Sequence, residues 1–477
     1  MIIARDMRFT DEQQRQLQRQ LADKITNYAS IDELRSLLVC GAQPNCEVTD
    51  SGLMPLHYAC FINNLGAAKL LLIKGAKVDA VDKNGCSALH LCAEHGYFRM
   101  IKLLLQYSKA VHQYEIPVMD VNGKYPSRQN VDEPLRLAIK NGHYDCARLL
   151  LENGASPNAI YFDGPEITHI SPMDTHFIEL LLEYGANPNV FDRKGLTPIM
   201  KACRVKENGI QAIRILHKYG GNVNAQADQR QDLRTPLHYA LLSGSAAVVK
   251  CLLELGADVN MPKGYDKPSV IDIAVLKDDP ELLKIIIDAG ADVNAIHTYI
   301  GSALHLAACS VLEHQYEIVR LLLEAGADPN IQHTFPDGSQ LKSPFVEYFR
   351  SRDVVDPRIV HLLLSYGARV VMRSPISNTL GQLRNVLRLA ATRDQPQFQV
   401  LNSMLALGED FDVSAIDRLP LPLALKGDIL ERAKNPPSLQ QICRLNLRSM
   451  VAPFRPDVVA GLPIPAHMKD YVLGRLP

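Results

Sequence analysis

Four histidines occupy equivalent places in the sequence and are the first candidates for metal binding or acid–base chemistry. Each ends a short phrase, and the four phrases are Met54-Pro55-Leu56-His57, Ser87-Ala88-Leu89-His90, Thr235-Pro236-Leu237-His238 and Ser302-Ala303-Leu304-His305. An active site occurs once in a chain, whereas a structural residue recurs in every unit of a repeating fold. We therefore predict that each histidine bonds to the neighbouring hydroxyl or backbone at a helix start and takes no part in catalysis.

The other reactive side chains do not form a recognisable site. His95 lacks the second histidine of a His-Glu-x-x-His motif, and the pairs Cys40/Cys46 and Cys86/Cys92 lack zinc-finger spacing. The ten cysteines include no Cys-x-x-Cys pair, and most lie in apolar helical patterns, so we expect reduced thiols. We find no phosphate-binding glycine loop and no Ser/His/Asp constellation. The sequence thus predicts no metal, no cofactor and no catalytic residue.

Composition narrows the class of protein further. The 477 residues carry 51 Lys and Arg against 52 Asp and Glu, so the net charge of −1 argues against a nucleic-acid or membrane-surface partner. Apolar residues make up 47% of the chain and aromatic residues only 6%, which predicts an aliphatic core. No signal-peptide segment and no run of about 18 apolar residues occurs. We expect an intracellular protein of the cytoplasm and also of the nucleus.

A phrase of the form Gly-Ala-x-x-Asn, preceded by apolar residues, recurs along most of the chain. Its glycines are Gly41, Gly75, Gly154, Gly185, Gly220 (as Gly-Gly), Gly256, Gly290, Gly326 and Gly367. In the phrase that ends in histidine, Ser or Thr predicts a helix N-cap, and Pro suits the first helical position. A second apolar helix follows, such as residues 317–323. Glycine then ends it in a left-handed conformation, and the asparagine segment predicts a turn.

These units resemble ankyrin repeats, whose period is close to 33 residues. The resemblance implies an all-α solenoid of about ten helix-turn-helix repeats over residues 1–375. The predicted repeats are 10–45, 51–83, 84–120, 131–162, 163–193, 194–228, 232–265, 266–298, 299–335 and 340–373.

Three places depart from the regular repeat. The polar stretch 111–130 predicts an inserted loop, and residues 331–343 predict a longer finger that turns at Pro336-Asp337-Gly338. The repeat that ends at Gly185 is short, so its first helix either begins near Ile167 or is truncated.

Residues 376–434 are predicted to form a degenerate capping repeat and a helical linker. Amphipathic helices are expected at 379–393 and 397–407, and Gly408-Glu409-Asp410-Phe411-Asp412 then imitates the repeat phrase. A stacked array needs such a cap to cover its last apolar face. A joint at Leu419-Pro420-Leu421-Pro422 precedes one more helix, which ends near Lys434.

Residues 435–477 have a different pattern. Ser438 predicts a helix start, and Leu439, Cys443 and Leu447 then fall at i, i+4 and i+8 on one helix face. Such a face is either ordinary core or a surface for a partner helix. In Leu462-Pro463-Ile464-Pro465, two prolines hold an extended segment from which Ile464 can project into a groove. Met468, Tyr471 and Val472 follow at helical spacing.

This C-terminal stretch resembles a SOCS box, and the whole chain resembles the ankyrin repeat and SOCS box family. Ser438, Leu439, Cys443 and Leu447 match the family's elongin-binding pattern, and Leu462, Pro463, Ile464 and Pro465 match its cullin-binding pattern. Leu419 to Pro422 also fits the second pattern, but it lies upstream of the first and is interpreted as a linker. The resemblance implies binding to elongin C with elongin B, and to cullin-5 with its RING-box partner.

The expected function is therefore that of a non-catalytic substrate-recognition subunit of a cullin-RING ubiquitin ligase, acting in ubiquitin conjugation and intracellular signalling. An unidentified protein substrate would bind the ankyrin repeats. By analogy its candidate contacts are exposed residues at loop tips, namely Tyr161, Phe162, Phe191, Arg193, Gln229, Arg230, His333 and Phe335. Two alternatives stay open: a scaffold that binds a partner without its ubiquitination, and an enzyme within residues 376–435.

Overall fold

The computed structural model describes most of the chain. The described residues are 11–108, 132–262, 265, 267–297, 300–335, 337–352, 355–371, 400, 403–409, 423–434, 438–451 and 454–474. The predicted loop at 111–130, the predicted helix at 379–393, residues 410–412 and the joint at 419–422 lie outside them.

The repeats form consecutive pairs of helices, as the sequence predicts. The pairs are α1 (Asp11–Thr26) with α2 (Ile31–Val39), α3 (Pro55–Phe61) with α4 (Leu65–Ile73), α5 (Ala88–His95) with α6 (Phe98–Tyr107), α7 (Pro134–Lys140) with α8 (Tyr144–Glu152), the 3-10 turn η1 (Glu166–Thr168) with α9 (Thr175–Glu183), α10 (Pro198–Cys203) with α11 (Ile210–Lys218), α12 (Pro236–Ser243) with α13 (Ala246–Glu254), α14 (Val270–Leu276) with α15 (Pro280–Asp288), α16 (Ala303–Cys309) with α17 (Gln315–Glu324), and α18 (Pro344–Ser351) with α19 (Pro357–Ser365). Ten pairs in the described part of the chain agree with the predicted number of repeats.

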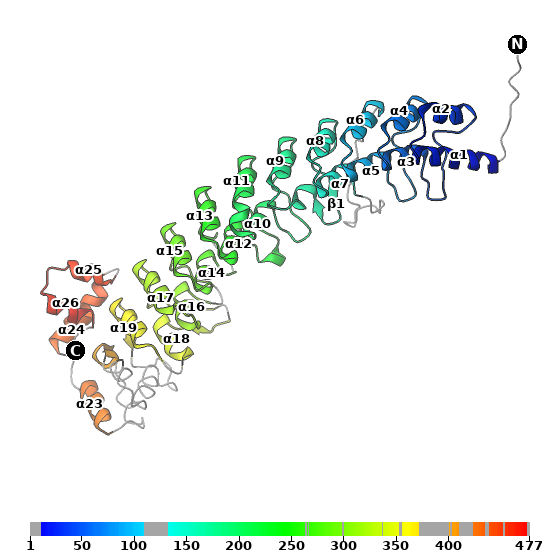
Figure 1. Cartoon of the computed structure of the whole chain (residues 1–477). Coiled ribbons are helices and arrows are strands. Elements are labelled where there is room, and N and C mark those ends of the chain that lie inside the picture. The colour runs from blue at the N-terminus through cyan, green and yellow to red at the C-terminus, as the bar shows by residue number, and fades with distance from the viewer. Residues whose placement is uncertain are drawn as a thin grey trace, which may run out of the picture. The chain divides into compact units, whose positions relative to one another are not determined.

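The chain divides into two compact units, one of residues 1–202 and 211–222 and the other of residues 203–210 and 223–477. In the first unit α1, α3, α5 and α7 pack in sequence order, and α2, α4, α6 and α8 form a second layer (Figure 1). In the second unit α12, α14, α16 and α18 form one layer, and α13, α15, α17 and α19 form the other. Within each of these layers, a helix therefore packs against the equivalent helix of the neighbouring repeat.

The apolar core lies between these two layers and is aliphatic, as predicted. In the repeat of α12 and α13, Leu237, Ala240, Val249 and Leu252 are all fully buried. Small side chains such as Ala240 let the two layers approach closely. Thr235 caps α12 ahead of Pro236, as predicted. No helix in the described part of the chain is both long enough and apolar enough to span a membrane.

The asparagine of the repeat phrase joins neighbouring repeats, which the turn interpretation from sequence did not anticipate. Its side-chain amide donates to the carbonyl of the phrase glycine one repeat further on, and its carbonyl accepts the backbone N–H two residues after that glycine. The donor pairs are Asn45 to Gly75, Asn158 to Gly185, Asn189 to Gly220, Asn224 to Gly256, Asn260 to Gly290, Asn294 to Gly326 and Asn330 to Gly367. This asparagine ladder runs along one edge of each unit.

Two of the predicted departures from the regular repeat lie within the described residues. In the short repeat the first helix is truncated to η1, which lies around Ile167. It follows the hairpin of β1 (Ile160–Tyr161) and β2 (Gly164–Pro165). The predicted finger is a hairpin of β3 (His333–Thr334) and β4 (Gln340–Leu341), and the Asp337 carboxylate accepts from the backbone N–H of Ser339 at 2.9 Å.

After the last helix pair, β5 (Val370–Val371) pairs in parallel with β6 (Gly408–Glu409). Residues 403–406 are helical, and α23 (Leu423–Lys434) ends where the sequence predicts. The C-terminal segment consists of α24 (Leu439–Met450), α25 (Pro456–Gly461) and α26 (Ala466–Val472). Secondary structure thus continues to the end of the described chain.

Candidate functional site

The four recurrent histidines cap helices, as predicted. The Nδ1 atom of His238 accepts from the backbone N–H of Thr235 at 3.1 Å and lies 2.8 Å from the Thr235 hydroxyl. His90 and His305 repeat this geometry with Ser87 and Ser302. Since Nδ1 accepts, the proton is on Nε2, and in His305 that atom donates to the Lys342 carbonyl at 2.8 Å. Burial lowers the pKa of His238 to about 4, so it stays neutral at physiological pH.

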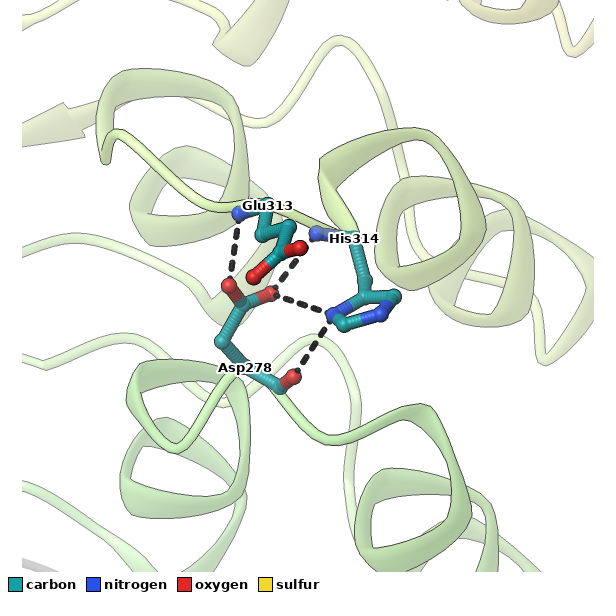
Figure 2. Close-up of side chains that lie close together, drawn as sticks. All are labelled: Asp278, Glu313 and His314. Atoms are coloured by element: carbon teal, nitrogen blue, oxygen red, sulfur yellow. Dashed lines mark hydrogen bonds and ion pairs between the residues drawn. The ribbon is translucent and has the colours of Figure 1, made fainter.

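Within the described residues, Asp278, Glu313 and His314 are the one group whose ligand atoms lie close enough to hold a metal ion. Figure 2 shows the interactions of the Asp278 carboxylate with the other two residues. It accepts the backbone N–H of Glu313 at 2.6 Å and that of His314 at 3.0 Å. The His314 ring nitrogen Nδ1 lies 3.1 Å from the Asp278 carbonyl. The carboxylate therefore fastens the turn after α14 to the segment before α17, which is a structural role.

The C-terminal helices α24, α25 and α26 pack around a small core of their own. Val459, Val472 and Leu473 form its buried centre, and Leu447, Phe454, Leu462 and Ile464 pack against them. Ser438 caps α24 by accepting from the backbone N–H of Gln441 at 3.2 Å, and the Gln441 side chain accepts from the Ser438 N–H at 2.8 Å. This reciprocal capping box agrees with the predicted helix start.

One face of α24 exposes apolar side chains to solvent. Leu439 is 77% exposed, Ile442 40% and Met450 80%, and Cys443 is also exposed. At 100° per residue these four side chains lie within a sector of about 100° on one side of the helix. We call Leu439, Ile442, Cys443 and Met450 the α24 stripe. Sequence reasoning selected Leu439 and Cys443 but missed Ile442 and Met450, although their offsets of three and eleven residues from Leu439 fit the same face.

The remaining residues of the two C-terminal motifs are placed differently. Leu447 is half-buried and packs against the box core. Leu462 and Ile464 also pack against that core, whereas Pro463 and Pro465 are exposed. The expectation that Ile464 projects outward therefore differs from the structure, because the short segment between α25 and α26 turns alternate side chains inward. The outward-facing groups of this segment are the two prolines.

The opposite face of α24 is held by two arginines. Arg444 is only 2% exposed, its guanidinium carbon lies 3.4 Å from the centre of the Tyr471 ring, and it donates to the Ala406 carbonyl at 3.1 Å. Arg448 donates to the carbonyls of Leu364 at 2.6 Å and Val472 at 2.9 Å. The helix therefore turns its cationic side chains inward and its apolar stripe outward.

The predicted substrate contacts in the first unit gather at two neighbouring loop tips. Phe162 is 79% exposed and Phe191 is 48% exposed. The Arg193 guanidinium carbon lies 4.4 Å from the centre of the Phe162 ring, and the Arg193 N–H donates to the Asp163 carbonyl at 3.1 Å. Phe162 and Arg193 therefore present one continuous surface, with Phe191 on the same loop as Arg193.

Tyr161 differs from the expectation of an exposed aromatic. The Arg136 guanidinium carbon lies 4.1 Å from the centre of its ring, and its hydroxyl is buried. Nearby Glu166 is only 2% exposed, and burial, opposed by the charge of Arg136, raises its pKa to about 7. The Tyr161 ring therefore packs against Arg136, and its hydroxyl is buried near Glu166.

The predicted contacts in the second unit are spread over two loops. Arg230 has an 82% exposed side chain whose guanidinium lies 3.7 Å from the Asp228 carboxylate, and Gln229 is exposed in the same turn η3 (Gln229–Gln231). His333 and Phe335 are half-buried, with ring centres 5.2 Å apart in an edge-on arrangement. The two loops offer no shared cluster comparable to Phe162 and Arg193.

Family models match most of the regions described above. A model of ankyrin repeats in three copies matches residues 25–120 and 171–263, and a single ankyrin repeat model matches 133–161 and 302–334. A SOCS box model matches residues 435–473, which contain α24, α25 and α26. The matched ankyrin segments include helix pairs from both compact units, such as α5 with α6 and α12 with α13.

The chain is similar to segments of several curated proteins. It is 28% identical over 202 residues to the E3 ubiquitin-protein ligase KEG of Arabidopsis thaliana, which covers 42% of this chain and 12% of that protein. It is 27% identical over 224 residues to human inversin, covering 46% of this chain and 20% of that protein. The chain therefore spans only a minor part of the length of these relatives.

Two solved structures are similar to part of the chain. The crystal structure of the human ASB11 ankyrin repeat domain covers 50% of this chain and 98% of its own, with 23% identity and a TM-score of 0.38. The ankyrin repeat domain of Bcl-3 covers 49% of this chain and 96% of its own, with 22% identity and a TM-score of 0.40.

Proposed function

Because the chain belongs to the ankyrin repeat and SOCS box family, we propose that it is the substrate-recognition subunit of a cullin-RING E3 ubiquitin ligase. In this proposal the SOCS box binds elongin C with elongin B and recruits cullin-5 with its RING-box protein. The ankyrin repeats bind a target protein. The observation that carries the proposal is the exposed apolar α24 stripe on a helix whose cationic side chains face inward.

Elongin C is proposed to bind the α24 stripe. Leu439 and Met450 expose most of their side chains, which is costly for a helix that stays free in water. Burying each against a partner contributes about 1.5–3 kcal/mol. Cys443 acts as a small packing residue between them. Leu447 supports this surface from within the box core.

Cullin-5 is proposed to contact the segment between α25 and α26. Pro463 and Pro465 are its outward-facing groups, and the ring of each proline fixes its own φ. Leu462 and Ile464 fix the segment to the box core by packing against Val459 and Val472. The two roles of the Leu-Pro-Ile-Pro motif, contact and anchoring, thus fall on alternate residues.

The proposed mechanism is proximity, so no residue of this chain forms or breaks a bond. A target held by the ankyrin repeats and a charged ubiquitin-conjugating enzyme held by the RING-box protein share one complex. Their effective concentration then far exceeds that of free collision, and target lysines attack the ubiquitin thioester at a higher rate. We place this activity in the cytoplasm and nucleus.

The target is proposed to contact the loop tips that carry Phe162, Phe191 and Arg193. Exposed aromatic rings beside an arginine are typical of energetically dominant interface positions. Arg193 offers a cation stacked on an apolar ring, which suits a segment with an apolar side chain next to a carboxylate. Arg230, His333 and Phe335 are proposed as further contacts in the second unit.

A second candidate function is that of an ankyrin scaffold that binds its partner without ubiquitination. The long series of stacked repeats favours it, because such arrays bind proteins through extended surfaces without any further domain. It differs from the ligase proposal in one respect: partner binding and cellular effect would not depend on Leu439.

The deciding experiment is co-expression of the full chain with elongins B and C, followed by size-exclusion chromatography and addition of cullin-5. The test variant is the double substitution Leu439→Asp, Cys443→Asp. Two charges placed in a desolvated interface abolish apolar binding, so we expect the wild type to co-elute with both elongins and capture cullin-5 while the variant elutes alone.

Leu423→Asp is the matched control, because Leu423 on α23 is 89% exposed and lies outside the stripe. It should bind elongins like the wild type. Replacing Pro463 and Pro465 with Ala should retain the elongins and lose cullin-5. A wild-type chain that elutes without elongins would overturn the ligase proposal and leave the scaffold.

A further inference from the structure

An arginine meets the C-terminal end of each of three helices around the SOCS box. Arg448 donates to the Leu364 carbonyl in the last turn of α19 and to the Val472 carbonyl at the end of α26, at 2.6 and 2.9 Å. It also donates to the Ala368 carbonyl just beyond α19 at 3.4 Å. Arg455 donates to the carbonyl of Glu324, the last residue of α17, at 3.4 Å. The last carbonyls of a helix lack helical partners and carry partial negative charge, so cations are stabilising there.

Arg448 joins the box to the last ankyrin repeat through hydrogen bonds. Its planar guanidinium presents several N–H groups at fixed angles, which lets one side chain reach two helix ends together. Its stem emerges from α24, on the side away from the α24 stripe. A single residue therefore links the helix proposed to bind elongin C with the ends of α19 and α26.

Phe454 and Gly367 complete the contact. The Arg448 guanidinium carbon lies 4.7 Å from the centre of the Phe454 ring. A β-carbon at Gly367 would lie 3.0 Å from the Phe454 ring, and Gly367 also has a φ of +92°. Glycine at this position thus serves both the left-handed end of α19 and the close approach of the box. Figure 1 shows α24, α25 and α26 beside α19 in the second unit.

We propose that Arg448 is a positioning residue that couples the elongin-binding face of α24 to the last ankyrin repeat, making the SOCS box a rigid extension of the second unit. This inference rests on the proposed function, because elongin binding to α24 is part of that proposal. It adds that stabilisation of α24 by a partner is transmitted to α19. The bound ubiquitin-transfer machinery then stays at one orientation to the neighbouring repeats.

The first test compares amide hydrogen exchange in the full chain and its variants. Arg448→Met keeps an apolar stem but removes all the hydrogen bonds to carbonyls. Hydrogen bonds from a charged donor are stronger than those from a neutral one. We therefore expect the protection of amides in residues 362–371 to fall by about tenfold or more in Arg448→Met. The control is Arg358→Met, because Arg358 lies on α19, the helix whose exchange is measured. Its guanidinium is largely exposed and pairs with Asp356 at 2.7 Å. It should change protection there by less than about twofold.

The second test adds elongins B and C to the same proteins. All three should bind with dissociation constants within about threefold, because Arg448 lies off the α24 stripe. Binding should raise protection at 362–371 in the wild type and Arg358→Met but not in Arg448→Met. A residue that only stabilises α24 would lower elongin affinity and leave this transmission intact.

Two outcomes would overturn the proposal: exchange in Arg448→Met that equals the Arg358→Met control, or elongin-induced protection of α19 that survives in Arg448→Met. Should Arg448→Met not fold, Arg448→Lys replaces it. A compact ammonium reaches one helix end but not both, so an intermediate loss of protection is expected. If the wild type does not bind elongins at all, the proposed function fails, while the exchange comparison in the free chain still decides whether Arg448 fastens α19.

Discussion

The side-chain amide of Asn294 donates to the backbone carbonyl of Gly326, in the next repeat, at 3.0 Å. The same side chain accepts the backbone N–H of Asp328 at 2.8 Å. A single side chain therefore pairs with both an acceptor and a donor of the loop that follows α17. Asparagine is suited to this position because its amide offers one group of each kind.

Asn294→Asp should destabilise the second unit. The carboxylate keeps an acceptor for the Asp328 N–H but sets a second oxygen against the Gly326 carbonyl, at a cost of about 1–3 kcal/mol. The measurement is the urea midpoint at pH 7. Asn153→Asp is the control: its amide bonds to the Leu149 carbonyl one turn back in its own helix, so the control should change the midpoint much less. Equal shifts of the urea midpoint in both variants would show that the hydrogen bonds between repeats contribute nothing to the stability of the unit.

Acid should weaken the fold through the capping histidines. His238 has a pKa of about 4 when folded against about 6.5 unfolded, so the unfolded chain binds the extra proton. Stability is then constant above about pH 7 and falls as pH drops from 6.5 towards 4, by up to about 1.4 kcal/mol per pH unit for this residue. Burial also lowers the pKa of His57 and His305, which steepens the fall.

Urea midpoints at pH 7.5, 5.5 and 4.5 test this dependence. His238→Gln should be less stable than the wild type at pH 7.5 and should lose less on acidification. The exposed His95 provides the control substitution His95→Gln, which should preserve the pH slope. A slope that is unchanged in His238→Gln would contradict the assignment.

Glu166 should have the opposite pH dependence. Burial raises its pKa from 4.5 to about 7, so the folded state holds the proton that the unfolded chain releases. Stability then falls as pH rises from about 4.5 to about 7 and stays lower above that. Glu166→Gln should remove this loss and raise the melting temperature at pH 8, by an amount equivalent to at most about 3 kcal/mol.

The check for Glu166 is a melting curve at pH 5 and pH 8 for the wild type, Glu166→Gln and the exposed control Glu183→Gln. The gain in melting temperature of Glu166→Gln should be larger at pH 8 than at pH 5, and Glu183→Gln should show no gain at either pH. A gain of equal size at both pH values would indicate packing, not protonation.

Asp278→Ala should destabilise the second unit by about 1–3 kcal/mol, because the N–H groups of Glu313 and His314 lose their acceptor. Asp278 also has a φ of +55°, which alanine adopts poorly and asparagine tolerates. Asp278→Asn should therefore lie between the wild type and Asp278→Ala in thermal unfolding. Addition of EDTA should leave all three melting temperatures unchanged; a fall in the wild type alone would indicate a bound ion.

Met450→Asp should weaken elongin binding by about tenfold or more, since Met450 lies on the α24 stripe and loses its apolar burial. Calorimetric titration of the purified chain with elongins B and C measures the effect. Val311→Asp is the comparison, because Val311 is 89% exposed and lies in the repeats. Equal affinities for the two variants would confine the interface to the N-terminal half of α24.

The regular parts of the fold could be predicted from sequence because their causes are local. A serine or threonine three residues before a histidine, an apolar helix and a glycine at its end each act within one repeat, so Thr235, His238 and Gly256 reveal the unit directly. The short repeat before α9 was also evident, although the sequence left open whether its first helix begins near Ile167 or is truncated, and the structure has the 3-10 turn η1 there.

The contacts between segments far apart in the chain could not be predicted in the same way. Nothing near Asn294 indicates that its partner lies 32 residues away. The residues that face inward from α24 were also unpredictable, since hydrophobic patterning would bury Leu439 and expose Arg444, and the structure has the reverse. Tyr161 likewise lies beneath Arg136 because of packing that its own loop does not encode.

The asparagine ladder also bears on how such a chain can lengthen during evolution. Every bond of the ladder runs from one repeat to the next, as from Asn260 to Gly290 and from Asn294 to Gly326. Duplication of a whole repeat in frame would therefore supply both partners of the new bond, and no existing bond would need replacement. The last two repeats are the exception, because Leu364 and Gly367 meet Arg448 and Phe454 of the box, and Glu324 of α17 meets Arg455. New repeats can thus be gained upstream of α16, while the final two are inherited together with the box that they hold.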